Sequence, residues 1–258
     1  MRYNILAVGD VSSSFGLEHL KRHLRTLQKQ KNIHFTVVNG ENVQMVGLLP
    51  SDAEEIFAAG ADVITLGNHS FGRAQIGSFL DENPYILRPS NLGRRVPGTG
   101  VGVYECGRAR IRVINLIGRT MMNNQADSPF READRLLSEG DKPTFTLVDF
   151  HAEASSEKLA MAYYLDGRVS ALWGTHTHVP TADEEVFPKG MGYITDLGMT
   201  GVIRSDLGVD PQQAVEFFLG GLPGRFRATK GPCKLQGAIF TLESETGLCT
   251  AVERVDIR

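Results

Sequence analysis

Gly174-Thr175-His176-Thr177-His178 is the stretch around which the rest of the chain is organised. It follows a short apolar run, residues 169–173, which predicts a buried strand. Two histidines two residues apart in extended chain would point to the same side, and imidazole is a common metal ligand near neutral pH. The stretch therefore indicates half of a metal site, although surface and structural histidines are commoner for such a pair taken alone.

Length and composition are those of a globular protein. The 258 residues allow one large domain or two small ones, with 41% hydrophobic and 22% charged residues. The net charge of −3 provides no basic excess of the kind that favours non-specific binding to nucleic acid or membranes. We find no repeat, low-complexity segment or linker, so a single domain over residues 1–258 is the simplest prediction.

The cysteines indicate the compartment. Cys106, Cys233 and Cys249 are odd in number and scattered, which argues against a disulfide framework and against a thiolate zinc site. The N-terminus runs straight into a predicted strand, and no run of eighteen apolar residues occurs. We therefore expect a cytoplasmic protein that neither spans a membrane nor is secreted.

The opening third alternates strands with helices. Predicted strands at 5–8, 35–38 and 63–66 each end in polar residues. The helix after the first strand follows Ser12-Ser13-Ser14, which can cap it, and shows leucines at helical spacing. The next helix starts at the capping-box pattern Ser51-Asp52-Ala53-Glu54 and ends at Gly60. Because ligands of open α/β sheets bind outside the carboxyl ends of the strands, we expect a site there.

The remainder continues as a mixed α/β pattern. We expect helices at 73–80, 129–140, 155–166 and 211–220, strands at 145–150 and 192–196, a hairpin of 101–106 with 111–116, and a closing antiparallel pair of 236–242 with 248–255. The fold class is therefore α/β with mixed sheets.

Residues of ligand type follow five of the predicted strands. These residues are Asp10, Glu41, Asn42, Asn68, His151, His176 and His178. The set has oxygen and nitrogen but no sulfur, which suits manganese, iron or zinc. Seven candidates are too many for one tetrahedral ion and about right for two ions that share a bridging carboxylate. His69, next to Asn68, would then be free to act as an acid.

Each of these residues also has an ordinary structural explanation. Asp10 could merely cap the first helix, Asn42 and Asn68 could be turn residues, and His151 could be a buried, hydrogen-bonded histidine. Five strand ends that all present a ligand-type residue are hard to obtain by chance. The conjunction therefore favours a metal centre.

The same residues carry a family resemblance. Gly9-Asp10, Gly40-Glu41-Asn42, Gly67-Asn68-His69, His151 and the 174–178 stretch occur in the order seen in calcineurin-like metallophosphoesterases. The chain more narrowly resembles the bacterial YmdB-like branch, through stretches such as Phe150-His151-Ala152-Glu153-Ala154 and Tyr193-Ile194-Thr195-Asp196. This resemblance covers nearly the whole chain.

The resemblance implies a four-layer α/β/β/α sandwich and a dinuclear centre. Asp10, Asn42 and His178 match ligands of one ion, Asn68, His151 and His176 match ligands of the other, and Glu41 matches the bridge. Ser12 occupies the place of a histidine in the wider superfamily. The implied cofactors are two divalent or mixed-valence ions, iron or manganese first and zinc as the alternative. The implied activity is hydrolysis of phosphodiesters, including 2′,3′-cyclic nucleotides such as 2′,3′-cyclic AMP, by a hydroxide that bridges the metals, with His69 as the catalytic acid.

Three loops beside the expected site depart from the branch: residues 11–16, 43–47 and 70–72. They leave open a second hypothesis, a metal-bound regulatory or nucleotide-binding protein with little or no turnover. An amidohydrolase also uses His-x-His, but normally near the N-terminus of a barrel, which does not fit this pattern. We expect a small-molecule phosphodiester partner; homo-oligomer formation is left open.

Overall fold

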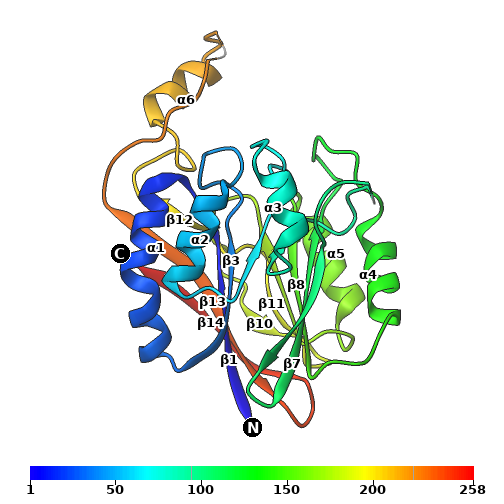
Figure 1. The fold of residues 1–258 in the computed structure, drawn as a ribbon. Coiled ribbons are helices and arrows are strands. Elements are labelled where there is room, and N and C mark those ends of the chain that lie inside the picture. Colours follow the sequence, from blue (N-terminus) through cyan, green and yellow to red (C-terminus); the bar gives the residue numbers. More distant parts are fainter. Residues whose placement is uncertain (94, 223) are drawn as a thin grey trace.

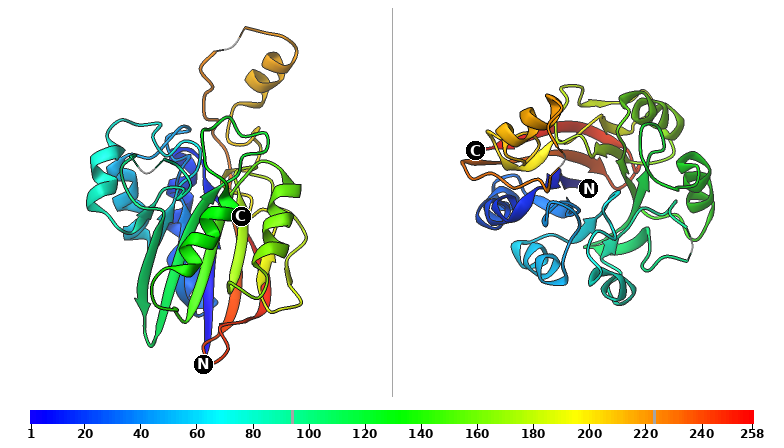
Figure 2. Two further views of the ribbon diagram at one scale, coloured as in Figure 1. Left: turned by 90° about the vertical axis from the view of Figure 1, so that its right-hand side faces the viewer. Right: turned by 90° about the horizontal axis from the view of Figure 1, so that it is seen from above.

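Two sheets packed face to face form the centre of the molecule. The computed structural model describes residues 1–93, 95–222 and 224–258, and in these ranges the chain forms six helices and fourteen strands. Helices cover the outer face of each sheet, which gives four layers, as Figure 1 and the view from above in Figure 2 show. This arrangement confirms the predicted α/β fold, a four-layer α/β/β/α sandwich with mixed sheets.

The first sheet has eight strands and contains the N-terminal strand. In spatial order its strands are β2 (Asp10–Val11), β12 (Met199–Val202), β13 (Cys233–Glu243), β1 (Arg2–Val8), β3 (Ile33–Asn39), β4 (Val63–Thr65) and β5 (Ile86–Leu87), and β14 (Cys249–Ile257) pairs with β13. The strands β1, β3, β4 and β5 are parallel, whereas β13 runs antiparallel to β1 and to β14. The predicted closing pair is thus confirmed.

The second sheet has six strands. Its spatial order is β10 (Glu185–Val186), β11 (Gly192–Ile194), β9 (Ala171–Thr175), β8 (Phe145–His151), β7 (Ala109–Ile117) and β6 (Val101–Cys106). The four central strands are parallel and both edge strands are antiparallel. The hairpin predicted around Gly107 is confirmed as β6 and β7.

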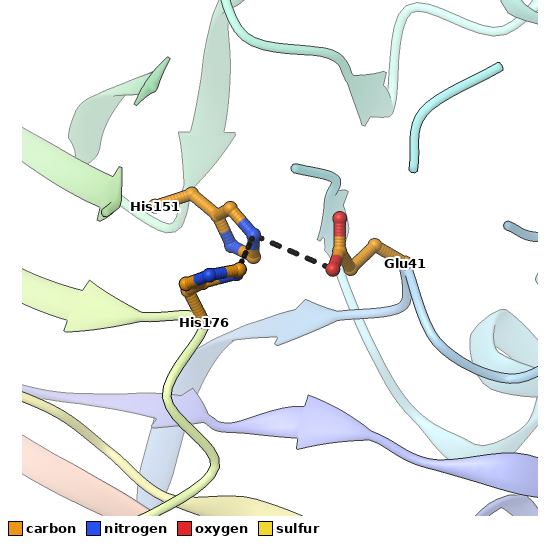
Figure 3. Close-up of side chains that lie close together, drawn as sticks. All are labelled: Glu41, His151 and His176. Atoms are coloured by element: carbon orange, nitrogen blue, oxygen red, sulfur yellow. Dashed lines mark hydrogen bonds and ion pairs between the residues drawn. The ribbon is translucent and has the colours of Figure 1, made fainter. Parts of the chain in front are cut away.

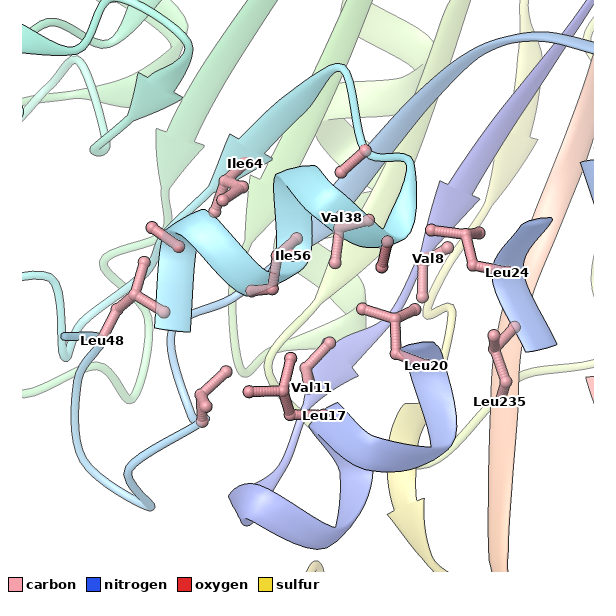
Figure 4. Packing of buried hydrophobic residues seen from close by; sticks show 14 of the residues in the cluster. Val8, Val11, Leu17, Leu20, Leu24, Val38, Leu48, Ile56, Ile64 and Leu235 are labelled. Carbon is pink, nitrogen blue, oxygen red and sulfur yellow. The ribbon is translucent and has the colours of Figure 1, made fainter. Parts of the chain in front are cut away.

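The helices pack through apolar faces on the sheets. They are α1 (Ser13–Gln30), α2 (Pro50–Ala59), α3 (Ile76–Glu82), α4 (Pro129–Ser138), α5 (Ser155–Leu165) and α6 (Pro211–Phe218). The leucines of α1 at positions 17, 20, 24 and 27 are buried in one cluster with Val8, Val38 and Leu235 of the first sheet and Ile56 of α2. Figure 4 shows this cluster and labels all of these residues except Leu27. Met161 and Leu165 of α5 pack on the other sheet, and a third cluster that includes Trp173 and Phe240 fills the space between the sheets.

Two predicted helix caps differ from the structure. Ser12 stands at the N-cap of α1, but its side chain makes no capping hydrogen bond. The helix α2 begins at Pro50, with Leu49 at the N-cap, so Ser51 lies inside the helix. The Asp52 carboxylate accepts the backbone N–H of Leu49 at 3.0 Å. Both residues of the predicted box were therefore wrong: the N-cap is Leu49 and not Ser51, and the carboxylate at N3 is Asp52 and not Glu54, because proline at the first helical position moves the start upstream.

The segment between β12 and β13 leaves the body of the protein. It carries α6, which stands away from the sheets in Figures 1 and 2. Of the eight residues of α6, only Ala214 is buried. None of the helices in the described part of the chain combines the length and the apolar character that crossing a bilayer requires.

Candidate metal centre

Both sheets bring ligand-type residues to the same edge of the molecule. Asp10 begins β2, Glu41 and Asn42 follow β3, and Asn68 follows β4. From the second sheet, His151 is the last residue of β8, and His176 and His178 follow β9. The carboxyl ends of parallel strands meet at one edge of a sheet, and the two sheets place these edges together. All seven predicted site residues and His69 therefore lie in one cluster.

Asp10, Asn42 and His178 form one side of the cluster. The Nε2 atom of His178 lies 3.0 Å from Nδ2 of Asn42 and 3.7 Å from Oδ1 of Asp10. The other ring nitrogen of His178, Nδ1, lies 3.0 Å from the carbonyl oxygen of Leu207. A carbonyl oxygen can only accept a hydrogen bond, so Nδ1 carries the proton of the neutral ring. The lone pair of Nε2 then faces Asp10 and Asn42.

Asn68, His151 and His176 form the other side. The Nε2 atom of His151 lies 2.9 Å from Oδ1 of Asn68 and 3.1 Å from Nδ1 of His176. The Nε2 atom of His176 lies 3.0 Å from a carboxylate oxygen of Glu153, which is its outer partner. The rings of His151 and His176 meet edge to face, as Figure 3 shows.

Glu41 lies between the two sides. Its Oε1 atom lies 3.3 Å from Nε2 of His151 and accepts a hydrogen bond of 3.0 Å from Nδ2 of Asn42. Ligand atoms of Glu41, His151 and His176 all lie within 4.8 Å of one another (Figure 3). A carboxylate with one neighbour on each side has the position that a bridging ligand requires.

Gly67 makes this close approach possible. A Cβ atom at this position would lie 2.2 Å from Nε2 of His151 and 2.4 Å from Oε2 of Glu41. Neither side chain could then reach its place. The glycine before Asn68 therefore keeps the backbone of the 67–69 turn directly against the ligand-type atoms.

Burial and neighbouring charges shift the pKa values of Glu41 and His151 in opposite directions. Both side chains are fully buried. Burial alone would raise the pKa of the Glu41 carboxyl, but His151 and His69 beside it hold the pKa well below its usual range. Burial would likewise lower the pKa of His151, but Glu41, Asp10 and Asp149 outweigh it and raise the pKa to about 9. The carboxylates therefore give this buried pocket a strong preference for positive charge.

The buried carboxylate of Asp10 shows whether a cation fits into this cluster. The Asp10 side chain is buried, and Oδ1 has no hydrogen-bond partner among the described residues. Burial raises the pKa of Asp10 to about 6, against the opposing effect of His178 and His151. A buried carboxylate oxygen without a donor is costly unless a cation satisfies it. The oxygen and nitrogen donors around it are those of a first-row transition ion.

His176 differs electrostatically from His151. Burial, together with the neighbouring His151, lowers the pKa of His176 to about 3. The ring is therefore neutral near pH 7 and can present a lone pair on Nδ1 toward Glu41 and His151. A neutral imidazole is the form that binds metals.

His69 lies at the mouth of the cluster. Its side chain is about one third exposed, its Nδ1 atom lies 3.1 Å from Oδ1 of Asn42, and its backbone N–H donates to Oε2 of Glu41 at 3.1 Å. With Nδ1 engaged inward, Nε2 is the nitrogen that can reach a bound molecule. His69 therefore has the position of a proton donor at the rim of the site.

The histidines of the 174–178 stretch are not on extended backbone. The strand β9 ends at Thr175, and the φ angles of His176 and His178 are +102° and +63°. The prediction that both rings point to one side of a strand was wrong, because a tight turn replaces the strand after Thr175. This turn directs His176 to Glu41 and His151, and directs His178 to Asp10 and Asn42.

Several residues that support the cluster were missed in the sequence. They include Asp149 and Thr175, which hydrogen-bond each other, Glu153 beside His176, and the buried pair of Lys158 with Asp196. A signal was present at Asp149, which is a carboxylate inside the apolar run 145–150. A buried charge in a strand needs partners, and here they lie on other elements.

Lys158 and Asp196 form an ion pair beneath the turn that carries His176 and His178. The Nζ atom of Lys158 lies 2.6 Å from Oδ2 of Asp196, and both side chains are buried. The same oxygen of Asp196 accepts the backbone N–H of Thr177 at 3.2 Å, between the two histidines. The pair therefore links helix α5 to the turn.

Removal of the lysine charge should destabilise the protein. We expect Lys158→Met to lower the free energy of unfolding by about 3–5 kcal/mol, because a buried carboxylate loses its partner. Lys21→Met is the matched control: Lys21 also pairs at 2.6 Å, but on the surface, where solvent screens the pair and the expected loss is small. Urea unfolding of both variants measures the difference. Equal losses would contradict the assignment of Lys158 to a buried pair.

The chain is similar to known proteins over nearly its whole length. The 2′,3′-cyclic-nucleotide 2′-phosphodiesterase of Bacillus subtilis (strain 168) is 41% identical over 253 residues, which is 97% of this chain and 96% of the relative. The crystal structure of a Mycoplasma pneumoniae protein described as a novel phosphatase has 32% identity and a TM-score of 0.93, covering 100% of this chain and 94% of that one. The NAD nucleotidase of Haemophilus influenzae, at 11% identity, shares the fold alone, with a TM-score of 0.62 and coverage of 99% and 56%.

The family follows from the extent of the match. The family model described as YmdB-like protein matches residues 6–255, which is nearly the full chain and includes every residue of the cluster. The resemblance noted from the motifs of the sequence is therefore confirmed: this chain belongs to the YmdB-like family.

Proposed function

We propose that this protein is a metal-dependent phosphodiesterase that hydrolyses small-molecule phosphodiesters, with 2′,3′-cyclic nucleotides as the substrate class. The observation that carries the proposal is the buried carboxylate oxygen Oδ1 of Asp10. It has no hydrogen-bond partner among the described residues, although it lies inside a cluster of oxygen and nitrogen donors. The B. subtilis relative, which is described as a cyclic-nucleotide phosphodiesterase, supports the same assignment.

The donor set divides into two groups that would each hold one ion. Asp10, Asn42 and His178 would hold the first, and Asn68, His151 and His176 the second, with Glu41 shared between them. Iron or manganese fits these donors best, and zinc is the alternative. When bound, two such ions would activate a water molecule and neutralise the charge that develops on the phosphoryl oxygens.

The residues of the chain would then have separate tasks. Glu41 would fix the separation of the two groups, because it contacts His151 on one side and Asn42 on the other. His69 in its doubly protonated form would donate the Nε2 proton to the leaving oxygen, while Nδ1 keeps its own proton in the hydrogen bond to Asn42. For a 2′,3′-cyclic nucleotide, cleavage of the 2′ P–O bond leaves the sugar hydroxyl protonated and the phosphate on the 3′ oxygen.

Removal of metal tests the proposal directly. We expect purified protein treated with a chelator to lose hydrolysis of 2′,3′-cyclic AMP, and we expect added Mn²⁺ to restore it, because the donor set alone has no group that activates water. Liquid chromatography of the nucleotide products measures both steps. Metal-loaded protein that binds the nucleotide and releases no product would instead support the regulatory alternative and contradict the proposed hydrolysis.

A further inference from the structure

We propose that Asp149 and Thr175 are positioning residues that hold His151 in one tautomer, with its Nε2 atom directed into the cluster. This inference rests on the proposed function, because His151 matters to catalysis only if it binds metal. It adds two residues that touch neither a metal nor a substrate, and it explains a carboxylate buried within an apolar strand.

The polarity of the hydrogen bonds sets the tautomer. The Thr175 hydroxyl donates to Oδ1 of Asp149 at 2.7 Å, and the Thr175 oxygen lies 3.0 Å from Nδ1 of His151. A hydroxyl group has a single proton to donate. Since that proton is committed to Asp149, the His151 nitrogen must donate to Thr175. Nδ1 of His151 therefore carries a proton, so Nε2 is the nitrogen whose lone pair a bound cation would use.

The atoms around Nε2 are ones that a bound cation would contact. Nε2 faces Oδ1 of Asn68 at 2.9 Å, Oε1 of Glu41 at 3.3 Å and Nδ1 of His176 at 3.1 Å. Two of these neighbours are oxygen acceptors, and the third is a ring nitrogen. A cation at the point where these atoms converge would satisfy all of them at once. A hydrogen bond on the far nitrogen of a metal-binding histidine fixes its ring in this way.

Asp149 also connects the two sheets. Its Oδ2 atom accepts a hydrogen bond of 2.5 Å from the hydroxyl of Thr65, which lies on β4 of the first sheet, whereas Asp149 lies on β8 of the second. A second link crosses the same boundary, because Nδ2 of Asn39 on β3 donates to the Thr175 hydroxyl at 3.4 Å. These contacts fix the second sheet, which carries the histidines, relative to the first.

Thr175 is the central residue of a hydrogen-bond relay that runs from Asp149 through Thr175 to His151. Its hydroxyl donates one hydrogen bond and accepts two, from His151 and Asn39, which is its full capacity. The side chains of Thr65, Asp149, His151 and Thr175 are all fully buried. Water therefore cannot replace a lost partner without rearrangement, and removal of the hydroxyl should leave the ring of His151 without its orienting contact.

The test compares three variants at two neighbouring threonines. Thr175→Val keeps the shape and removes the hydroxyl, Thr175→Ser keeps the hydroxyl, and Thr177→Val is the control within the same stretch. We expect Thr175→Val to bind Zn²⁺ about 10–100-fold more weakly than wild type in chelator competition, as for loss of other outer partners of metal ligands. Thr175→Ser and Thr177→Val should retain wild-type affinity. Wild-type affinity in Thr175→Val would overturn the relay and leave the metal centre intact.

A spectroscopic measurement on the wild-type protein locates the proton of His151 directly. In Zn²⁺-loaded protein with ¹⁵N-labelled histidine, we expect His151 to show a proton on Nδ1 that exchanges slowly with water, and a metal-shifted Nε2. In Thr175→Val, exchange of that proton should become faster. A His151 that carries its proton on Nε2, or binds Zn²⁺ through Nδ1, would overturn the proposal. Wild-type protein that binds no Zn²⁺ would overturn the proposed metal centre and the relay with it.

Discussion

Glu41→Gln should reduce turnover of 2′,3′-cyclic AMP by about 10³-fold, the upper range for loss of one electrostatic contact in a catalytic site. The amide keeps the size of the side chain but removes the charge that lies between the two groups of donors. In the structure, Glu41 is fully buried and contacts His151 and Asn42. The variant should therefore also hold less metal than wild type, which elemental analysis after gel filtration measures.

The control for this variant is Glu54→Gln, an exposed glutamate of helix α2. We expect wild-type turnover and metal content, because Glu54 is on the solvent side of the helix. The comparison separates loss of the charge at the cluster from loss of a charge elsewhere on the protein. Wild-type turnover in Glu41→Gln would remove Glu41 from the proposed bridging role.

His69→Ala should lower the rate of hydrolysis of 2′,3′-cyclic AMP by about 10²–10⁴-fold, the usual contribution of a positioned general acid. The ribose oxygen is a poor leaving group and needs a proton as the P–O bond breaks. The metal content should stay at the wild-type level, because His69 is at the rim and is not among the seven proposed ligands. His23→Ala on helix α1 is a control in which an equally sized ring is removed far from the cluster.

The leaving group distinguishes a proton donor from a residue that only supports the fold. Bis(p-nitrophenyl) phosphate releases p-nitrophenolate, which leaves without protonation. We therefore expect His69→Ala to lose far less activity on this substrate than on 2′,3′-cyclic AMP. Equal losses on both substrates would argue against proton donation and for a role in positioning.

Much of the fold followed from local pattern. The apolar runs of β1, β3, β8 and the closing pair, and the leucine spacing of α1, predict these elements because burial of one face sets the period of the sequence. The short strands β2, β5, β10 and β12 were missed. Each has two to four residues. Unlike the equally short β4 and β11, they do not stand out as apolar runs in the sequence, and they form because a neighbouring strand already offers its hydrogen-bonding edge.

The candidate site was predictable to the extent that its residues follow strands. Parallel strands bring their carboxyl ends together, so Asp10, Glu41 and Asn68 could be placed near one another without a structure. The turn at His176 and His178 could not be predicted, since non-glycine residues rarely adopt positive φ angles. The partners of Asp149 were equally hidden, because Thr65 is 84 residues away and on the other sheet.

The metal content of the purified protein tests the central claim most directly. Elemental analysis of wild-type protein, His176→Ala and His178→Ala after gel filtration should give two ions per chain for wild type and preferential loss of one ion in each variant. The physical reason is that the turn directs His176 to Glu41 and His151 but directs His178 to Asp10 and Asn42. Two ions per chain in both variants, or none in the wild type, would contradict the proposed centre.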